Sequence, residues 1–136
     1  MIFVDTSYFH AFFEPLDENH SRALGAAREF RGQRLPDLLI TTDFVVMETI
    51  TLARSRASHR QAVLVGDHLF NEKSARIYRT TFEEQRAAFE ILRKYDDKEY
   101  SSVDCLSFLV MEKLGITEAL TFDSDFSHRF NVRPRL

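Results

Sequence analysis

Short apolar runs alternate along the chain with longer segments of helical periodicity. The runs are rich in β-branched and aromatic residues, which is typical of buried strands. Pro134 limits the last of them to a short strand at an edge. The predicted strands are Ile2–Val4, Leu38–Thr41, Ala75–Arg79, Ile116–Phe122 and residues 131–136.

The segments between these strands carry helix start and stop signals. Hydroxyl and acidic residues precede most of them as candidate N-caps, Pro15 ends the first, and Gly115 is a C-cap for the last. The predicted helices are Ser7–Phe13, Asn19–Arg34, Phe44–Arg56, Ser58–Asn71, Phe82–Tyr95 and Val103–Leu114.

The alternation of strand and helix predicts an α/β fold with a largely parallel sheet and helices on both faces. The chain has 136 residues and shows no internal repeat or linker. We therefore expect one domain, residues 1–136.

Composition and charge limit the function class and the cellular location that we expect for the protein. The formal net charge is −3, which argues against a general nucleic-acid coat protein but not against an enzyme that meets nucleic acid through a local basic patch and bound metal ions. No apolar run approaches the length of a membrane span. Cys105 is the single cysteine and lies in an apolar pattern typical of a buried residue. A cytoplasmic location without disulfides is expected.

Acidic residues follow two of the predicted strands. Asp5 comes directly after the first strand, and Asp123 directly after the strand that ends at Phe122. If these parallel strands are neighbours, both carboxylates lie at the same rim of the sheet. Glu48 lies inside a largely apolar helix, and Asp104 in the first turn of another.

Each acid also has a purely structural interpretation. Asp5 can cap the helix that follows it, Asp123 can form an Asx-turn, and Asp104 can favour the helix dipole. Glu48 can reach solvent or pair with an arginine. These alternatives remain open for each residue alone, but convergence of all four would need another reason.

A cluster of carboxylates needs a cation to offset its mutual repulsion. Ligands that are all oxygen suit hard cations such as Mg²⁺ or Mn²⁺. Mg²⁺ keeps several waters, which leaves positions for a substrate phosphate and an attacking water. The chemistry that follows is metal-assisted hydrolysis of a phosphodiester.

Four stretches, taken in order, resemble the PIN-domain ribonucleases, and among these the VapC toxins of toxin–antitoxin pairs. The stretches are VDTS at Val4–Ser7, ETITL at Glu48–Leu52, SSVDCLSFLVMEKLGI at Ser101–Ile116 and ALTFDSDF at Ala119–Phe126. The resemblance implies an α/β/α sandwich with an acidic pocket that holds Mg²⁺ or Mn²⁺.

The resemblance also implies roles for individual residues. Three acids would ligate the metal, Glu48 would position or deprotonate the attacking water, and an accessory acid would help to bind a second ion. Hydroxyl groups near the first acid would support it or contact a phosphate. The implied ligands are Asp5, Asp104 and Asp123, the accessory acid is Asp125, and the hydroxyl residues are Thr6 or Ser7 and Thr121.

The partners that the resemblance implies are an RNA substrate, a cognate antitoxin protein and a second copy of the chain. Two alternatives remain. One is an inactive PIN-like binding or assembly module, and the other is a phosphatase-like hydrolase, although the DxDx[TV] pattern is absent after Asp5. Substrate would separate a nuclease from a phosphatase.

Other kinds of site receive less support from the sequence. The histidines show no zinc-binding spacing, and they are predicted to lie at the surface or at helix ends, with His128 near enough to the acidic stretch to touch phosphate. No glycine-rich nucleotide loop is present. Two arginine groups are candidates for the rim of an RNA groove or, equally, for solvated surface: Arg54, Arg56 and Arg60, and Arg129, Arg133 and Arg135.

Overall fold

The computed structural model describes residues 1–135 and shows a parallel sheet between two layers of helices. The strands are β1 (Ile2–Val4), β2 (Leu39–Thr42), β3 (Arg76–Tyr78), β4 (Glu118–Leu120) and β5 (Asn131–Arg133). The α-helices are α1 (Thr6–Phe13), α2 (His20–Ala27), α3 (Asp43–Arg56), α4 (His59–Phe70), α5 (Phe82–Lys94) and α6 (Ser102–Leu114). Short 3₁₀ turns are η1 (Arg28–Phe30), η2 (Leu35–Asp37) and η3 (Ser124–His128).

The strand order is β3-β2-β1-β4-β5, and every neighbouring pair is parallel. Strands β2 and β3 therefore lie on one side of β1, and β4 and β5 lie on the other side. Val4 pairs with Leu120, so the segments that follow β1 and β4 leave the sheet side by side. Such a reversal of strand order opens a crevice beyond the carboxyl ends of the strands.

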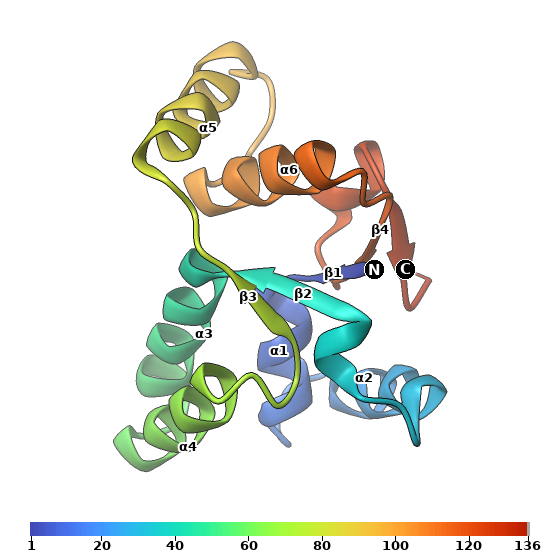
Figure 1. Ribbon diagram of the computed structural model, residues 1–136. Coiled ribbons are helices and arrows are strands. Elements are labelled where there is room, and N and C mark those ends of the chain that lie inside the picture. The colour runs from blue at the N-terminus through green and yellow to red at the C-terminus, as the bar shows by residue number, and fades with distance from the viewer. Residues whose placement is uncertain (136) are drawn as a thin grey trace.

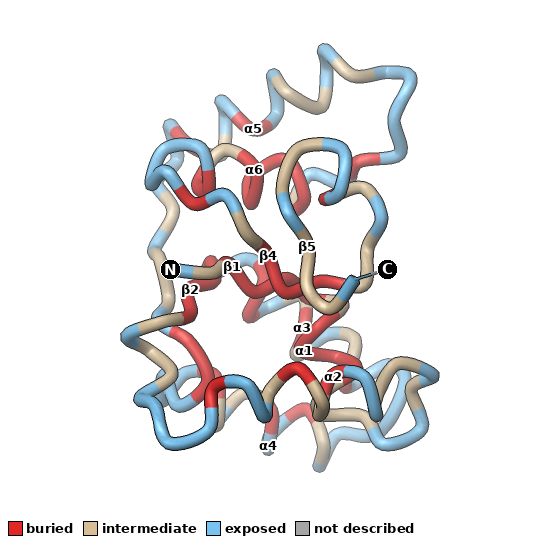
Figure 2. Tube along the Cα trace, turned by 90° about the vertical axis from the view of Figure 1, so that its right-hand side faces the viewer, coloured by how far each residue is buried: buried red, intermediate tan, exposed pale blue. Residues whose placement is uncertain are grey.

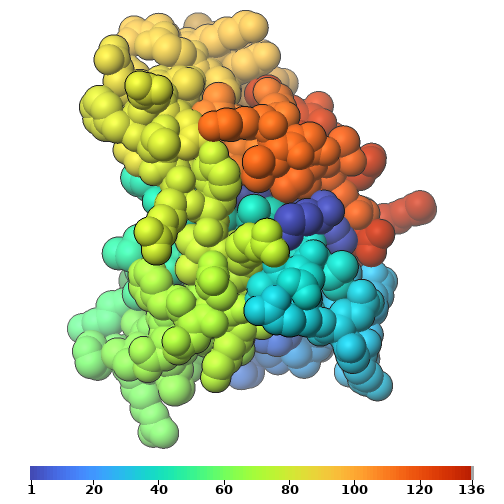
Figure 3. All heavy atoms as spheres, in the orientation of Figure 1, coloured from blue at the N-terminus to red at the C-terminus, as the bar shows by residue number. Residues whose placement is uncertain are grey.

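Helices cover both faces of the sheet. Figure 1 shows α5 and α6 on one face and α1 to α4 on the other, which confirms the predicted α/β sandwich. The first turns of α1, α3 and α6 all lie near the carboxyl ends of the strands. In the space-filling view, the left-hand outline is indented at the level of the sheet, between α5 above and the pair formed by α3 and α4 below (Figure 3).

The core lies along the central strands and α6 (Figure 2). Phe3 and Leu120 are fully buried in β1 and β4. Phe108 of α6 contacts Phe126 edge to face, with ring centroids 4.9 Å apart. This packing fixes α6 against the sheet and so places its first turn at the acidic rim. Within residues 1–135, no helix has both the length and the apolar character needed to cross a bilayer.

Local capping explains most helix boundaries. Thr42, Thr81 and Ser101 accept hydrogen bonds from backbone N–H groups in the first turns of α3, α5 and α6. Gly115 ends α6 with φ 69°, a left-handed conformation that favours glycine.

Two predicted boundaries were wrong or fall partly outside the structure. The helix predicted over Asn19–Arg34 ends at Ala27, tightens into η1, and turns where Gly32 takes φ 81°. The predicted tail strand is present over Asn131–Arg133, but its last residue, Leu136, lies outside the described residues.

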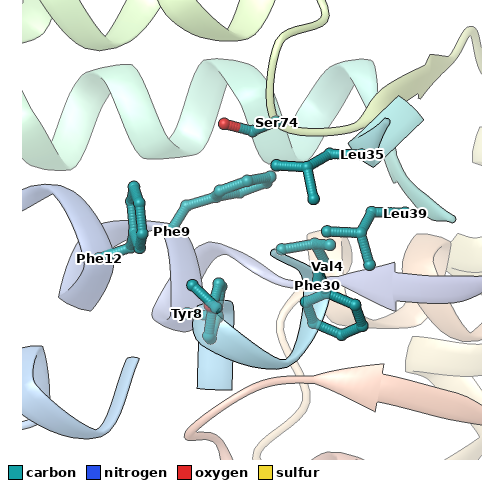
Figure 4. Close-up of a pocket in the computed structure, with 9 residues that line it drawn as sticks. Val4, Tyr8, Phe9, Phe12, Phe30, Leu35, Leu39 and Ser74 are labelled. Carbon is teal, nitrogen blue, oxygen red and sulfur yellow. The ribbon is translucent and has the colours of Figure 1, made fainter. Parts of the chain in front are cut away.

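An apolar pocket lies between α1, η1 and the strands β1 and β2 (Figure 4). Its volume is about 50 Å³, and Tyr8, Phe9 and Phe30 form much of its wall. None of its lining residues is acidic. It is therefore separate from the acidic rim and offers no carboxylate that could bind a metal ion.

Glu84 connects three elements on the α5 side of the sheet. Its carboxylate accepts hydrogen bonds from the hydroxyl of Tyr78 (2.6 Å), Nζ of Lys113 (2.9 Å) and the backbone N–H of Thr81 (2.8 Å). Burial alone would raise the pKa of Glu84, but these hydrogen bonds outweigh it and lower the pKa to about 2. The ionised side chain therefore holds β3, α5 and α6 together.

We expect Glu84→Ala to lower the free energy of unfolding by about 2 kcal/mol, because it removes a capping box and the charged hydrogen bonds that a buried carboxylate makes with Tyr78 and Lys113. Urea unfolding followed by circular dichroism measures this. Glu83→Ala is the matched control, since Glu83 shares the first turn of α5 but is exposed. It should change stability by less than about 0.5 kcal/mol. Equal effects of the two substitutions would contradict the bridging role.

Candidate active site

Asp5 lies directly after β1, where it is buried and caps α1. Its Oδ2 accepts three hydrogen bonds: from the backbone N–H of Ser7 (3.3 Å), from Oγ of Ser7 (2.8 Å) and from Oγ1 of Thr121 (3.0 Å). The side chain is thus held in one orientation by residues that follow both β1 and β4.

The same two hydroxyl groups also order the loop that follows β4. Oγ of Ser7 accepts a hydrogen bond from the backbone N–H of Phe122 (2.9 Å), and Oγ1 of Thr121 accepts one from the N–H of Asp123 (3.0 Å). The two oxygens lie 3.1 Å apart. A single network therefore positions Asp5 and the backbone that carries Asp123.

Asp104 and Asp123 are each held in a similar way. Oδ2 of Asp104 accepts from the N–H of Ser101 (3.0 Å) within the capping box of α6. Oδ1 of Asp123 accepts from the N–H of Asp125 (2.9 Å) at the start of η3. Within residues 1–135, the second oxygen of Asp5, of Asp104 and of Asp123 makes no hydrogen bond to the protein.

These acids meet in one cleft of about 300 Å³. Asp5, Glu48, Asp104 and Asp123 all line it. Carboxylate oxygens of Asp104, Asp123 and Asp125 lie within 4.8 Å of one another. Asp125 is therefore close to two of the acids, although it is not part of the wall of the cleft.

Burial and mutual repulsion favour the neutral forms of these acids in the absence of a cation. Burial raises the pKa of Asp5 to about 6, although its hydrogen bonds oppose the change. Burial, together with the charges of Asp5 and Asp123, raises the pKa of Asp104 to about 7. Burial also raises the pKa of Asp123. A bound cation would offset these penalties.

The groups present fit a hard divalent cation. The available donors are carboxylate oxygens, which suit Mg²⁺ or Mn²⁺. Oγ1 of Thr6 is buried beside them and has no hydrogen-bond partner in the described part of the chain. Thr6 also lines the cleft, so the wall of the cleft contains a buried hydroxyl group whose hydrogen bonding the described residues do not satisfy.

The acids converge on one cleft, and three of them also have the structural roles that the sequence predicts. Asp5 does cap α1, Asp104 does form a capping box, and Asp123 does cap η3. Each of these functions uses only one carboxylate oxygen. The side chain of Glu48 forms no ion pair with an arginine in residues 1–135 and is half-buried against the cleft.

The sequence interpretation missed part of the cleft wall and left the positions of several basic residues open. His10 lies in the last turn of α1, which is one of its two predicted positions, but it is buried in the wall of the cleft. Of the first arginine group, Arg56 alone lines the cleft. The sequence carries a signal for both residues. His10 is four residues after Thr6 and Arg56 is eight residues after Glu48, so each lies on the same helix face as a predicted site residue. The other newly found lining residues are Asp17, Asn19 and Leu52.

The second arginine group does not form part of the rim. Arg129 pairs with Glu112 and packs over the ring of Phe108. Arg133 pairs with Glu118 and with Glu29. The ring of His128 lies beside Tyr100 rather than in the cleft. Ion pairing and aromatic packing thus account for these basic side chains.

Comparison with known proteins gives a consistent result. A family model described as PIN domain matches residues 2–129. The 23S rRNA-specific endonuclease VapC20 of Mycobacterium tuberculosis is 38% identical over 127 residues, which cover 93% of this chain and 92% of the relative.

Solved structures agree with this match. The crystal structure of VapC20 from M. tuberculosis, a toxin that cleaves the sarcin–ricin loop, superposes with a TM-score of 0.85 at 35% identity and covers 94% of each chain. FitAcB from Neisseria gonorrhoeae superposes with a TM-score of 0.65 over 97% of this chain and 96% of that one. At 13% identity, the second match supports the fold alone.

Metal binding should depend on pH in the range set by Asp5 and Asp104. Their folded pKa values of about 6 and about 7 exceed the ordinary value of 3.8. At pH values between the ordinary pKa and these raised pKa values, the folded protein binds more protons than the unfolded chain does. The metal-free protein therefore loses stability as pH rises through this range. A cation binds only the deprotonated acids, so we expect Mn²⁺ to raise the Tm far more at about pH 8 than at about pH 5.

Thermal unfolding with Mn²⁺ and with EDTA at the two pH values measures this effect. Asp104→Asn should remove most of the Mn²⁺-induced shift. Asp67→Asn is the charge-matched control, since Asp67 is exposed on α4, and it should keep the whole shift. A shift independent of pH, or unchanged in Asp104→Asn, would place the ion elsewhere.

Proposed function

This chain belongs to the PIN-domain family, and on that basis we propose that it is a metal-dependent endoribonuclease that hydrolyses RNA phosphodiester bonds. We take residues 1–136 as one PIN-like domain. The observation that carries the proposal is the state of Asp5, Asp104 and Asp123. Each has one oxygen fixed by the protein and one oxygen without a protein partner in the described chain.

The relative suggests a substrate. VapC20 is described as specific for 23S rRNA and as cleaving the sarcin–ricin loop. The high structural similarity over 94% of both chains supports the same class of substrate here. We propose the sarcin–ricin loop of 23S rRNA as the first RNA to test.

Asp5, Asp104 and Asp123 would hold Mg²⁺ or Mn²⁺, and Asp125 would support the site or a second ion. When bound, the ion supplies a water of lowered pKa and neutralises charge on the phosphate. The hydrogen bonds to Asp5 and Asp104 orient these carboxylates before any ligand arrives. This preorganisation lowers the cost of assembling the site.

Glu48 is the candidate general base. It lines the cleft and has no hydrogen bond or ion pair to its carboxylate within residues 1–135, so it is available to accept a proton from the attacking water. The hydroxyl of Thr6 would donate a hydrogen bond to a phosphate oxygen. The hydroxyl of Ser7 is already engaged with Asp5, and Thr121 supports the same carboxylate. These two hydroxyl groups would position rather than react.

Purified protein is expected to cut a labelled sarcin–ricin-loop RNA with Mg²⁺ or Mn²⁺ and not with EDTA. Asp5→Asn and Asp104→Asn should lose both metal binding and cleavage. Glu48→Gln should keep metal binding but lower kcat by about 100-fold or more, because general base catalysis is removed. Asp67→Asn should cut like the wild type.

The remaining outcomes select among other functions. A folded protein that binds Mn²⁺ and cuts no RNA but hydrolyses a small phosphoester would be a phosphatase-like hydrolase. A folded protein with neither metal binding nor cleavage would be an inactive PIN-like module. Cleavage by Asp5→Asn equal to that of the wild type would refute the assigned site.

We also propose that the protein acts in the cytoplasm as a toxin whose activity is blocked by an antitoxin protein. The name and described activity of the relative support this proposal. Expression of the chain alone should arrest bacterial growth, and co-expression with the product of an adjacent gene should restore it. Growth arrest by the Asp5→Asn variant would separate toxicity from nuclease activity.

We also propose that two copies of the chain form a homodimer. Large apolar side chains are exposed on α3 and α4, among them Met47 (55%), Leu64 (55%) and Phe70 (59%). Such exposure is typical of surfaces that associate. Light scattering should give twice the chain mass of 15.9 kDa, and Leu64→Glu should shift the protein toward the monomer. A wild-type mass equal to one chain would rule out this dimer.

A further inference from the structure

The acidic cleft extends well beyond the group of carboxylates. Glu48, Leu52 and Arg56 all line it and follow one another at four-residue intervals on α3. At 1.5 Å of rise per residue, Arg56 lies roughly 12 Å along the helix from Glu48. The cleft therefore has two ends, an acidic one at the strands and another at the last turn of α3.

The charges in the cleft are distributed unevenly. Five carboxylates line it, those of Asp5, Asp17, Glu48, Asp104 and Asp123. The basic residues of its wall are His10 and Arg56. His10 is buried, with Nε2 3.8 Å from Oδ2 of Asp17. Arg56 is thus the one permanently charged cation among the described residues of the wall.

The guanidinium group of Arg56 is not engaged by the protein. Within residues 1–135 it forms neither an ion pair nor a hydrogen bond, although the same cleft contains several carboxylates. Arg129 and Arg133, by contrast, are held by glutamates. An arginine offers five N–H donors that match the oxygens of a phosphate. Arg56 therefore presents an unused phosphate-binding group to the cleft.

We propose that Arg56 binds a phosphate of the RNA strand other than the one that is cut, and so sets how the strand lies along α3. The inference rests on the proposed nuclease function and adds a second contact to it. Bound ions at the strand ends would receive the scissile phosphate, while Arg56 would receive a neighbouring one roughly 12 Å along the helix from Glu48. Arg56 is a positioning residue, since it lies away from the carboxylates.

Arg54 provides a matched control. It lies in the same last turn of α3, it is exposed like Arg56, and both interact alike with the helix dipole. Only Arg56 lines the cleft. A general effect of positive charge would appear in both variants, whereas a phosphate contact in the cleft would appear in one.

The test compares Arg56→Gln, Arg56→Lys and Arg54→Gln on the sarcin–ricin-loop RNA. Arg56→Gln should raise KM by about 10-fold or more, as expected for loss of a charged hydrogen bond, and leave kcat within about two-fold because the reacting groups are intact. The salt dependence of log(kcat/KM) should weaken by about 0.7, the value for one phosphate contact to a single strand. Arg56→Lys should restore the salt dependence but only part of the KM. Arg54→Gln should match the wild type.

RNA binding measured by fluorescence anisotropy in the Asp5→Asn background keeps the two proposals separate. Weaker binding by Arg56→Gln than by Arg54→Gln supports the phosphate contact even if the wild type cuts no RNA, in which case the nuclease proposal alone fails. Equal binding and equal KM for the two variants overturn the contact, whether or not the wild type cuts. A fall in kcat without a change in KM also overturns it, because Arg56 would then act at the reacting phosphate.

Discussion

The hydrogen bonds that Ser7 and Thr121 donate to one oxygen of Asp5 are the interaction on which the site depends. They cross between the segments that follow β1 and β4, the two strands at the reversal of the strand order. The same hydroxyl groups accept from the backbone N–H groups of Phe122 and Asp123. The two hydroxyl groups therefore hold the buried carboxylate of Asp5 in place and also fix the shape of the loop that follows β4.

In each of the acids Asp5, Asp104 and Asp123, one carboxylate oxygen contributes to folding and the other is available to a ligand. One oxygen of Asp104 satisfies a backbone N–H at the start of α6, and one oxygen of Asp123 does the same at the start of η3. These two hydrogen bonds cap the first turns of α6 and η3, so the acids also contribute to the local structure. An asparagine keeps a side-chain oxygen for the same hydrogen bond while it removes the charge. The proposed catalytic role and the structural role are therefore separable by an Asp→Asn substitution at these positions.

Much of this arrangement could be predicted from the sequence, and the limit has a physical cause. The strand predicted to end at Phe122 ends at Leu120, so Asp123 follows it after two further residues. Asp5 and Asp123 still lie at one rim, because β1 and β4 are parallel neighbours. Local pattern cannot decide which hydroxyl faces which partner, and only the structure separates the engaged Ser7 from the unpartnered Thr6. The place of Arg56 likewise depends on how α3 is rotated about its axis, which is determined by packing against α1 and α4.

The net charge of −3 is consistent with an enzyme that acts on RNA. A chain with this charge does not attract a polyanion over its whole surface, and arginines such as Arg129 and Arg133 are neutralised by glutamates. On the proposed function, a bound cation and Arg56 would supply the favourable electrostatics within the cleft. Few phosphate contacts mean weak non-specific binding. On the proposed function, selectivity would then come from the shape of the RNA, since a loop whose backbone already bends into the cleft loses little entropy when it binds.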